Sequence, residues 1–388
     1  MALTLSEKCE RISGSKIREM FRKAGLYSDV IDFTIGEPDF VSSQGVKDAA
    51  CEAITNGKEK YTENAGVIEL RKLISEDLQK RNGRYYDPIK QIIITPGAMG
   101  ALYLAFSVIL NKGDEVILSN PTWTNYKHQI EMNDGIAVFV DAGEDNDFII
   151  ETEKIEKAIS KHTKAILINS PANPTGGVLD RSTLIKLSEI AEKNNLIVIA
   201  DETYRKIIYG GEVYDSIGSI AKMEGHTLII DSFSKSNAMT GWRVGYAAGP
   251  EEIIQNMVKF QENVSACVSE PSQYAAIAAL KSDDEHINMM VAEYEKRRNF
   301  ICNRIDKIDT LSIKKPKGAF YAFINIKETG LSSDEFVNLL LERKHVLVVP
   351  GTAFGEKGEG YIRLSYATDI NKISEGLDKI EAFIEELQ

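Results

Sequence analysis

The stretch Asp231-Ser-Phe-Ser-Lys-Ser-Asn-Ala-Met-Thr-Gly-Trp-Arg-Val-Gly-Tyr246 decides how this 388-residue chain is interpreted. The apolar run 227–230 leads into it as a predicted strand, and the small residues 244–248 lead out of it. Ser-x-Ser-Lys alone is typical of a solvated polar loop. The Gly-Trp-Arg-x-Gly-Tyr that follows is not expected in a solvated loop, so the stretch predicts a binding site.

The polar side chains of this stretch suit a ligand that carries two different functional groups. The amine of Lys235 can condense with an aldehyde to a Schiff base if part of it is neutral at working pH. The hydroxyls of Ser232 and Ser234 and the guanidinium fork of Arg243 suit a phosphate dianion. Pyridoxal 5′-phosphate carries both groups, and we expect it as the cofactor.

The whole segment closely resembles the lysine segment of class I aminotransferases, which belong to fold type I of the pyridoxal-phosphate enzymes. The resemblance extends from Gly36-Glu-Pro-Asp to Arg363-Leu-Ser-Tyr. It implies an α/β protein with a large, mostly parallel sheet of seven strands and a smaller α/β domain. It also implies a homodimer that moves an amino group between an L-amino acid and a 2-oxo acid such as 2-oxoglutarate.

A second phosphate contact is expected where a buried strand, residues 91–95, runs into Pro96-Gly-Ala-Met-Gly100 and an apolar helix. A strand, a glycine turn and a helix leave free backbone N–H groups at the helix start, which favour an anion, although glycines there also serve packing alone. The resemblance implies that the amides of Ala98 and Met99 hold the cofactor phosphate.

An acidic residue follows the buried strand 196–200. Asp201 at the carboxyl end of such a strand points into the ligand crevice of an open α/β sheet, unless it is simply a helix N-cap. A buried carboxylate needs a cationic partner, and a protonated pyridine nitrogen would be one. Tyr204 lies one helical turn further on. The resemblance implies that Asp201 keeps the ring nitrogen protonated and that Tyr204 binds the phenolic oxygen.

The resemblance also implies roles for residues that carry little signal of their own. Trp123 lies on the cofactor ring, and Asn173 of Asn-Pro-Thr-Gly binds the phenolic oxygen and the substrate carboxylate. Gly36 and Arg363 bind that carboxylate too, although a lone arginine within a strand is more often exposed. Tyr61 crosses to the partner's phosphate, so that each site needs two chains.

The strand–helix alternation predicts the division of the chain. We expect residues 1–43 to form an N-terminal arm and part of the small domain, residues 44–285 the large cofactor-binding domain, and residues 286–388 the small C-terminal domain. The boundary lies where the alternation stops at a long charged helix, about 286–308. Near the N-terminus, residues 6–25 are expected to form one helix.

Composition narrows the class of protein. The net charge is −12, with 43% hydrophobic and 27% charged residues, so we expect a globular protein with neither nucleic-acid nor membrane partners. Four widely spaced cysteines without CxxC or Cys/His clusters favour reduced thiols and no metal site. With no signal peptide or membrane span in the sequence, we expect a cytoplasmic location.

Several activities remain to be distinguished. An aspartate-like donor is expected, but Met99 stands where aspartate-preferring relatives often have a polar residue, and Trp123, Tyr126 and Phe320-Tyr321 leave aromatic donors open. A carbon–sulfur lyase of the same fold would share every anchor. A nicotinamide oxidoreductase lacks its Gly-x-Gly-x-x-Gly here, and a non-catalytic sensor would ordinarily carry a DNA-binding module.

Overall fold

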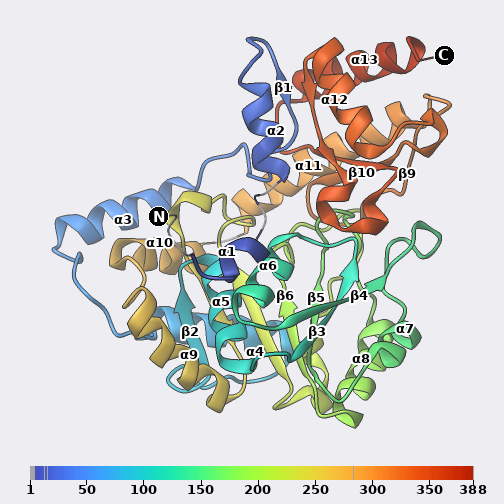
Figure 1. Cartoon of the computed structure of the whole chain (residues 1–388). Coiled ribbons are helices and arrows are strands. Elements are labelled where there is room, and N and C mark those ends of the chain that lie inside the picture. The colour runs from blue at the N-terminus through green and yellow to red at the C-terminus, as the bar shows by residue number, and fades with distance from the viewer. Residues whose placement is uncertain (1–4, 13, 15, 283, 388) are drawn as a thin grey trace.

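The computed structural model describes residues 5–12, 14, 16–282 and 284–387, which form a larger and a smaller body (Figure 1). The larger body is built on a seven-stranded sheet of order β2-β8-β7-β6-β5-β3-β4, in which β8 alone runs antiparallel to its neighbours. Its strands are β2 Ile92–Thr95, β3 Glu115–Asn120, β4 Ile136–Asp141, β5 Thr163–Asn169, β6 Ile197–Asp201, β7 Thr227–Ser232 and β8 Gly245–Ala248.

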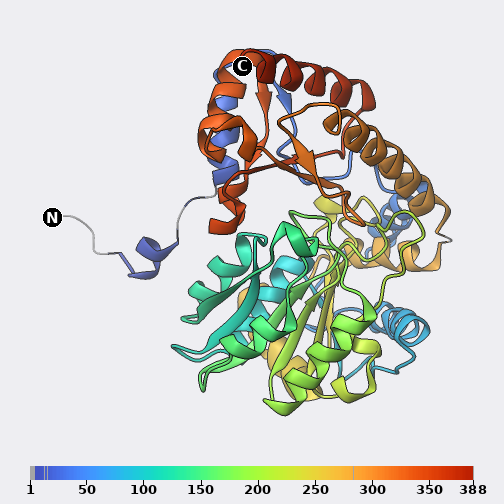
Figure 2. The same cartoon turned by 90° about the vertical axis from the view of Figure 1, so that its right-hand side faces the viewer.

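Helices cover both faces of this sheet (Figures 1 and 2). Alternate residues of one strand therefore enter different cores: Ile92 and Ile94 of β2 join one apolar cluster and Ile93 joins another. Burial on both faces explains the unbroken apolar runs in the sequence. The helices of this body are α3 Gln44–Thr55, α4 Ile68–Asn82, α5 Gly97–Ile109, α6 Asn125–Met132, α7 Thr152–Ala158, α8 Arg181–Lys193, α9 Glu251–Val264 and α10 Glu270–Lys281.

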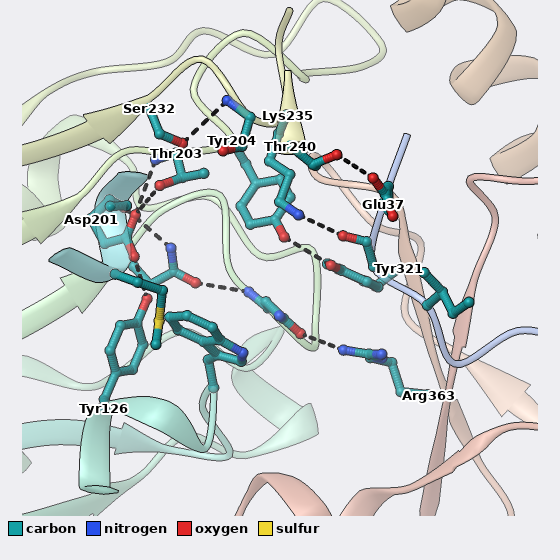
Figure 3. Close-up of a pocket in the computed structure, with 18 of the residues that line it drawn as sticks. Glu37, Tyr126, Asp201, Thr203, Tyr204, Ser232, Lys235, Thr240, Tyr321 and Arg363 are labelled. Atoms are coloured by element: carbon teal, nitrogen blue, oxygen red, sulfur yellow. Dashed lines mark hydrogen bonds between the residues drawn. The ribbon is translucent and has the colours of Figure 1, made fainter. Parts of the chain in front are cut away.

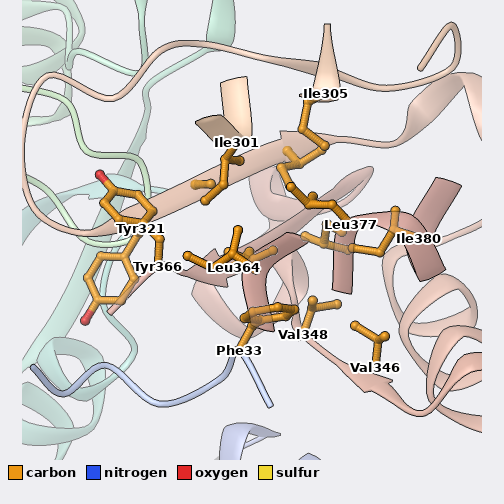
Figure 4. Packing of buried hydrophobic residues seen from close by; sticks show 14 of the residues in the cluster. Phe33, Ile301, Ile305, Tyr321, Val346, Val348, Leu364, Tyr366, Leu377 and Ile380 are labelled. Carbon is orange, nitrogen blue, oxygen red and sulfur yellow. The ribbon is translucent and has the colours of Figure 1, made fainter. Parts of the chain in front are cut away.

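The smaller body has an antiparallel sheet of order β12-β13-β10-β9, packed against three helices. Aliphatic residues from the helices, such as Ile301, Leu377 and Ile380, meet Leu364 of the sheet in one core (Figure 4). Its elements are α11 Glu285–Ile305, β9 Ser312–Ile313, β10 Tyr321–Asn325, α12 Ser333–Lys344, β12 Val349–Pro350, β13 Tyr361–Ser365 and α13 Ile370–Glu385.

The N-terminal segment joins the smaller body. Strand β1 (Ile31–Asp32) pairs in parallel with β11 (Val346–Leu347), and Phe33 lies in the core of the smaller body beside Val346 and Val348 (Figure 4). These contacts support the expected division at residues 43 and 285, and we propose it as the domain organisation of the chain.

The single helix expected over residues 6–25 is wrong. The chain forms α1 (Lys8–Arg11) and α2 (Lys16–Ala24), and Ile12 after α1 has extended backbone angles, φ −89° and ψ 103°. The two helices pack on different bodies: Lys8 and Arg11 pair with Asp134 just after α6, whereas α2 lies against β11 and β12. The sequence between the two helices, Ile12-Ser-Gly-Ser15, is made largely of poor helix formers, so a break there agrees with local propensity as well as with these contacts.

No helix of the described ranges is both long and apolar enough to cross a membrane.

Candidate active site

A cavity of about 490 Å³ opens where the carboxyl ends of the parallel strands meet the smaller body (Figure 3). In an open α/β sheet this edge is where ligands bind. The cavity brings together every site residue that the sequence predicts except Tyr61: Gly36, Ala98, Met99, Trp123, Asn173, Asp201, Tyr204, Ser232, Ser234, Lys235, Arg243 and Arg363.

Asp201, the last residue of β6, is a buried carboxylate without a cationic partner. One oxygen accepts from the Tyr126 hydroxyl at 2.7 Å and the other from the Thr203 hydroxyl at 2.6 Å. Burial raises the pKa of this carboxyl above its usual value, although the hydrogen bonds oppose the shift. In the described part of the chain no lysine or arginine bonds to it, so a cationic ligand atom would find its counter-charge here.

Lys235 extends into the cavity from the loop after β7. Its Nζ donates to the backbone carbonyl of Gly36 at 2.5 Å, across the cavity from the larger body (Figure 3). Burial lowers the pKa of this amine from its ordinary 10.5 to about 8; Glu37 opposes the shift, and the guanidiniums of Arg363 and Arg243 add to it. A useful fraction of the amine is therefore neutral, as a nucleophile or a general base requires.

An anion cradle forms at the start of α5. The helix begins at Gly97, so the amides of Ala98 and Met99 belong to the first turn, whose N–H groups have no partner within the helix. Gly97 has φ +68°, and a Cβ there would come within 2.8 Å of Nη2 of Arg243. Glycine therefore lets the guanidinium lie directly against the turn, where it could bind the same anion as the amides.

The two serines of Ser-Phe-Ser-Lys line the same cavity. Ser232 is the last residue of β7, and its Oγ accepts weakly from the backbone N–H of Ser234 at 3.4 Å. Both residues line the cavity, so their hydroxyl groups could donate to an anion that occupies the cradle.

Arg363 lies in β13 and is 2% exposed, which removes the alternative of an exposed strand arginine. Its Nη1 donates to Oδ1 of Asn173 at 3.1 Å, and its Nη2 donates to the carbonyl of Thr34 at 2.6 Å. Its Nε is buried without a hydrogen-bond partner among the described residues. A buried fork held by two neutral acceptors fits a carboxylate ligand, with which it would form a bidentate pair.

Several cavity residues were not assigned a role from the sequence. Tyr126 and Thr203 hold Asp201, and Tyr321 meets Tyr204 with 2.8 Å between their hydroxyl oxygens. Asn169, the last residue of β5, accepts the Asn173 N–H at 2.9 Å. The rule that singled out Asp201, a polar residue ending a buried strand, would also have found Asn169.

Behind the cavity lies what we call the α4 charge network, a set of buried ion pairs between α4 and the ends of β6 and β7. Arg205 bridges Asp77 at 3.0 Å and Asp231 at 2.6 Å, and Arg81 pairs with Glu202 and with Asp77. Burial alone would raise the pKa of Asp77, yet Arg205 and Arg81 hold it below its usual value.

Tyr61 is the one predicted residue that the structure leaves outside the cavity. Its side chain is 89% exposed. The neighbouring Lys60 donates its backbone N–H to Glu270 at the start of α10, at 3.1 Å. Within one chain Tyr61 therefore contributes nothing to the cavity.

The donor set fits pyridoxal 5′-phosphate. Asp201 lacks a cation and could face a pyridinium N–H, the α5 cradle with Arg243 suits the phosphate, and Lys235 has the lowered pKa that Schiff-base formation requires. Trp123, whose ring meets that of Tyr126 edge to face at 5.2 Å, offers an aromatic surface to the cavity. Arg363 remains for a substrate carboxylate.

Comparison with known proteins gives one consistent result. The family model for class I and II aminotransferases matches residues 28–380. An aspartate aminotransferase of Pyrococcus abyssi is 40% identical over 386 residues, and an aromatic-amino-acid aminotransferase of Thermococcus litoralis is 38% identical over 386 residues; each alignment covers 99% of both chains.

Solved structures agree with this comparison. The aspartate aminotransferase of Rhizobium meliloti superposes with a TM-score of 0.96 at 32% identity, covering 99% of both chains. The aromatic aminotransferase of Pyrococcus horikoshii superposes with a TM-score of 0.90 at 40% identity, covering 95% of this chain and 99% of that one.

Proposed function

The chain belongs to the class I and II aminotransferases, and from that premise we propose how its cavity residues move an amino group between an L-amino acid and a 2-oxo acid. Pyridoxal 5′-phosphate, when bound, supplies an aldehyde for the amino group and a ring that withdraws electrons from the substrate Cα. The observation that carries the proposal is Lys235, an amine of lowered pKa that faces Gly36 across the cavity.

Lys235 first holds the cofactor and then acts as the proton carrier. Once an incoming amino group had taken its place, its free Nζ would accept the proton of the substrate Cα and later release it, so that one residue would serve as both base and acid. In the cofactor-free chain burial lowers the pKa of this amine to about 8, so it can accept and release a proton near neutral pH.

The other polar residues orient the cofactor and the substrate. Asp201 would pair with a protonated ring nitrogen, and Tyr204 and Asn173 would hydrogen-bond the phenolic oxygen. Arg363, already bonded to Asn173, binds the substrate carboxylate together with Gly36. Ser232, Ser234, Arg243 and the amides of Ala98 and Met99 would bind the phosphate, and Trp123 would offer its ring face to the pyridine ring.

Aspartate is the donor that we propose first, because the relatives at about 40% identity include aspartate aminotransferases. One observation favours aromatic donors as a second candidate. The lysines and arginines that line the described cavity are Lys235, Arg243 and Arg363, and each already has a proposed partner. Among the described residues that line the cavity, a second substrate carboxylate would find no further cation, whereas Tyr126 and Tyr321 offer aromatic contact.

A donor panel tests the function and the donor together. Purified protein loaded with cofactor is assayed with aspartate, tyrosine, phenylalanine and alanine, each against 2-oxoglutarate, with glutamate formation as the readout. We expect glutamate from aspartate at the highest kcat/KM. Release of pyruvate and ammonia from cystathionine, without glutamate from any donor, would identify a lyase instead.

The partner chain is the remaining part of the proposal. We propose a homodimer in which Tyr61 binds the phosphate of the neighbouring site, which would explain a tyrosine that is 89% exposed in one chain. Exposed apolar side chains on α3 and α9, among them Ile54 and Val264, support a covered surface nearby. A cytoplasmic location, expected from the sequence, belongs to the same proposal and is checked by cell fractionation.

Light scattering and a Tyr61→Phe variant test this assembly. We expect a dimer in solution and a variant that remains dimeric but binds the cofactor several-fold more weakly, because one hydrogen bond to a charged group is lost. Tyr85→Phe, a change at another exposed tyrosine, serves as the matched control. A fully active monomer would contradict the shared site.

A further inference from the structure

Tyr321 extends from the smaller body to touch a proposed cofactor ligand of the larger one. It is the first residue of β10, and its hydroxyl oxygen lies 2.8 Å from that of Tyr204, which follows β6 (Figure 3). Both rings are buried, with 1% and 6% exposure. In the part of the chain that the structure describes, neither hydroxyl has another hydrogen-bond partner.

The surroundings fix where the Tyr321 hydroxyl lies. A Cβ on Gly36 would come within 2.2 Å of it, so the glycine backbone closes one side. The guanidinium of Arg363 lies 4.5 Å from the centre of the Tyr321 ring and covers one ring face. The two tyrosine rings meet edge to face at 5.8 Å. The hydroxyl therefore has little freedom to turn away from Tyr204.

Proton counting gives the direction of this hydrogen bond once the cofactor is bound. In a pair of hydroxyls only one proton lies between the two oxygens, and the other proton is free for a third group. If Tyr204 donates to the cofactor's phenolic oxygen, the proton between the tyrosines must come from Tyr321. An oxygen that accepts one hydrogen bond becomes a stronger donor in the next, by about 10–30%.

We propose that Tyr321 is a positioning residue of this aminotransferase: its hydroxyl donates to Tyr204, directs the Tyr204 proton toward the phenolic oxygen of the cofactor and strengthens that bond. The inference rests on the proposed role of Tyr204. Because Tyr321 belongs to β10, the strength of a donor in the larger body depends on how closely the smaller body approaches it.

The experiment is a pH titration of the visible absorbance of the bound cofactor in purified holoenzyme, for wild type, Tyr204→Phe, Tyr321→Phe and the double variant. A donor at the phenolic oxygen favours the form in which that oxygen holds negative charge, so its loss moves the midpoint to higher pH. We expect a rise of about one pH unit for Tyr204→Phe and about 0.1–0.3 for Tyr321→Phe.

The double variant is the decisive measurement. If Tyr321 acts through Tyr204, the double variant titrates like Tyr204→Phe alone. Tyr366→Phe is the matched control, because Tyr366 lies in the same core (Figure 4) but bonds the carbonyl of Ala319 at 3.2 Å, so we expect no shift from it. Cofactor affinity, measured in parallel, should fall in Tyr321→Phe by less than in Tyr204→Phe.

Two results would overturn the inference: an unchanged midpoint in Tyr321→Phe, or additive shifts in the double variant. Both are distinguishable from a failure of the proposed function. If the wild-type protein binds no pyridoxal phosphate or transfers no amino group, the function itself is wrong. If the wild type titrates and Tyr204→Phe shifts it but Tyr321→Phe does not, only the link between the two tyrosines is wrong.

Discussion

At the ends of β6 and β7, the carboxylates on the α4 side are paired with arginines, whereas the carboxylate on the cavity side has no such partner in the ranges that the structure describes. Asp201 faces the cavity with no cation, and burial raises the pKa of its carboxyl. Its neighbour Glu202 faces the α4 charge network and pairs with Arg81. Asp231 likewise pairs with Arg205 at 2.6 Å behind the sheet, while the next residue, Ser232, lines the cavity. Consecutive strand residues point to opposite faces, which separates the two sets.

The difference distinguishes structural charge from charge reserved for a ligand. In the α4 charge network each carboxylate has a guanidinium within the chain, as a buried ion pair requires. Among the described residues of the cavity, Asp201 has no lysine or arginine partner, Nε of Arg363 has no hydrogen-bond partner, and the pKa of Lys235 is lowered. The cavity therefore has the charges that a cofactor and a carboxylate substrate would complete.

Replacing Lys235 should have the largest effect. Lys235→Ala removes both the covalent attachment and the proton carrier, so we expect transamination to fall by several orders of magnitude and the visible absorbance of the attached cofactor to vanish. Borohydride treatment followed by mass spectrometry should find the cofactor bound to Lys235 in the wild type alone. A variant with full activity would contradict the assignment.

The next largest effect is expected at Asp201. Asp201→Ala removes the counter-charge of the ring nitrogen, which is worth about 3–5 kcal/mol, or roughly a hundred- to several-thousand-fold in rate. The cofactor should still bind, because its phosphate is held elsewhere. A cofactor with a permanently charged N-methyl pyridinium should restore part of the single-turnover rate. No recovery, or a near wild-type rate, would make Asp201 a packing residue.

Arg205 tests the other side of the comparison. Arg205→Met leaves Asp231 and Asp77 without this guanidinium, and Asp231 is 5% exposed, so unfolding in urea should become easier by about 3 kcal/mol. The rate per folded molecule at saturating cofactor should change little, since Arg205 does not line the cavity. A large loss of rate with unchanged stability would mean that the network serves the chemistry directly.

The smallest expected effect is a change of the free energy of unfolding with pH, caused by Lys235 in the cavity. In cofactor-free protein the pKa of Lys235 is about 8, against its ordinary 10.5 in the unfolded chain. Between these values the unfolded chain binds the extra proton, so stability rises with pH, by less than about 1.4 kcal/mol per pH unit because the side chain is partly exposed. Urea melts at pH 7.5, 8.5 and 9.5 should reveal this slope relative to Lys235→Met; identical slopes would contradict the lowered pKa.

The sequence predicts those features of the fold and the site that depend on residues close together in the chain. Asp201 and the α5 cradle follow from strand, turn and helix order within about ten residues, and the sheet with its helices follows from the apolar runs. The burial of Arg363 depends on β13 pairing with β10 and β12 on either side, which its own segment does not encode. The break between α1 and α2 has a local signal in Ser13-Gly-Ser15, whereas the packing of the two helices on different bodies depends on distant contacts.

Partners distant in sequence were the hardest to predict. Tyr126 reaches Asp201 across 75 residues, and Tyr321 reaches Tyr204 across 117. The sequence indicates both tyrosines only as aromatic surface, because the partner of a hydroxyl group depends on how α6 and β10 pack on the sheet. The α4 charge network has the same origin: charged residues on a helix predict a solvated face until the fold buries them.

The antiparallel strand β8 has a consequence for a chain that is still being synthesised. β2, at the sheet edge, has β8 as its hydrogen-bonded neighbour, and Thr95 is paired with Gly245, roughly 150 residues later. At about 5–20 residues per second a ribosome needs about 8–30 s to cover that distance. Throughout this interval Ile92–Ile94 lack their strand partner, and α5 has no sheet edge that would bring its first turn to Ser232. A nascent chain arrested before β8 should therefore bind no pyridoxal phosphate, and protease should still cleave it near residue 95. If that segment is protected before β8 is synthesised, another strand must pair with β2 first.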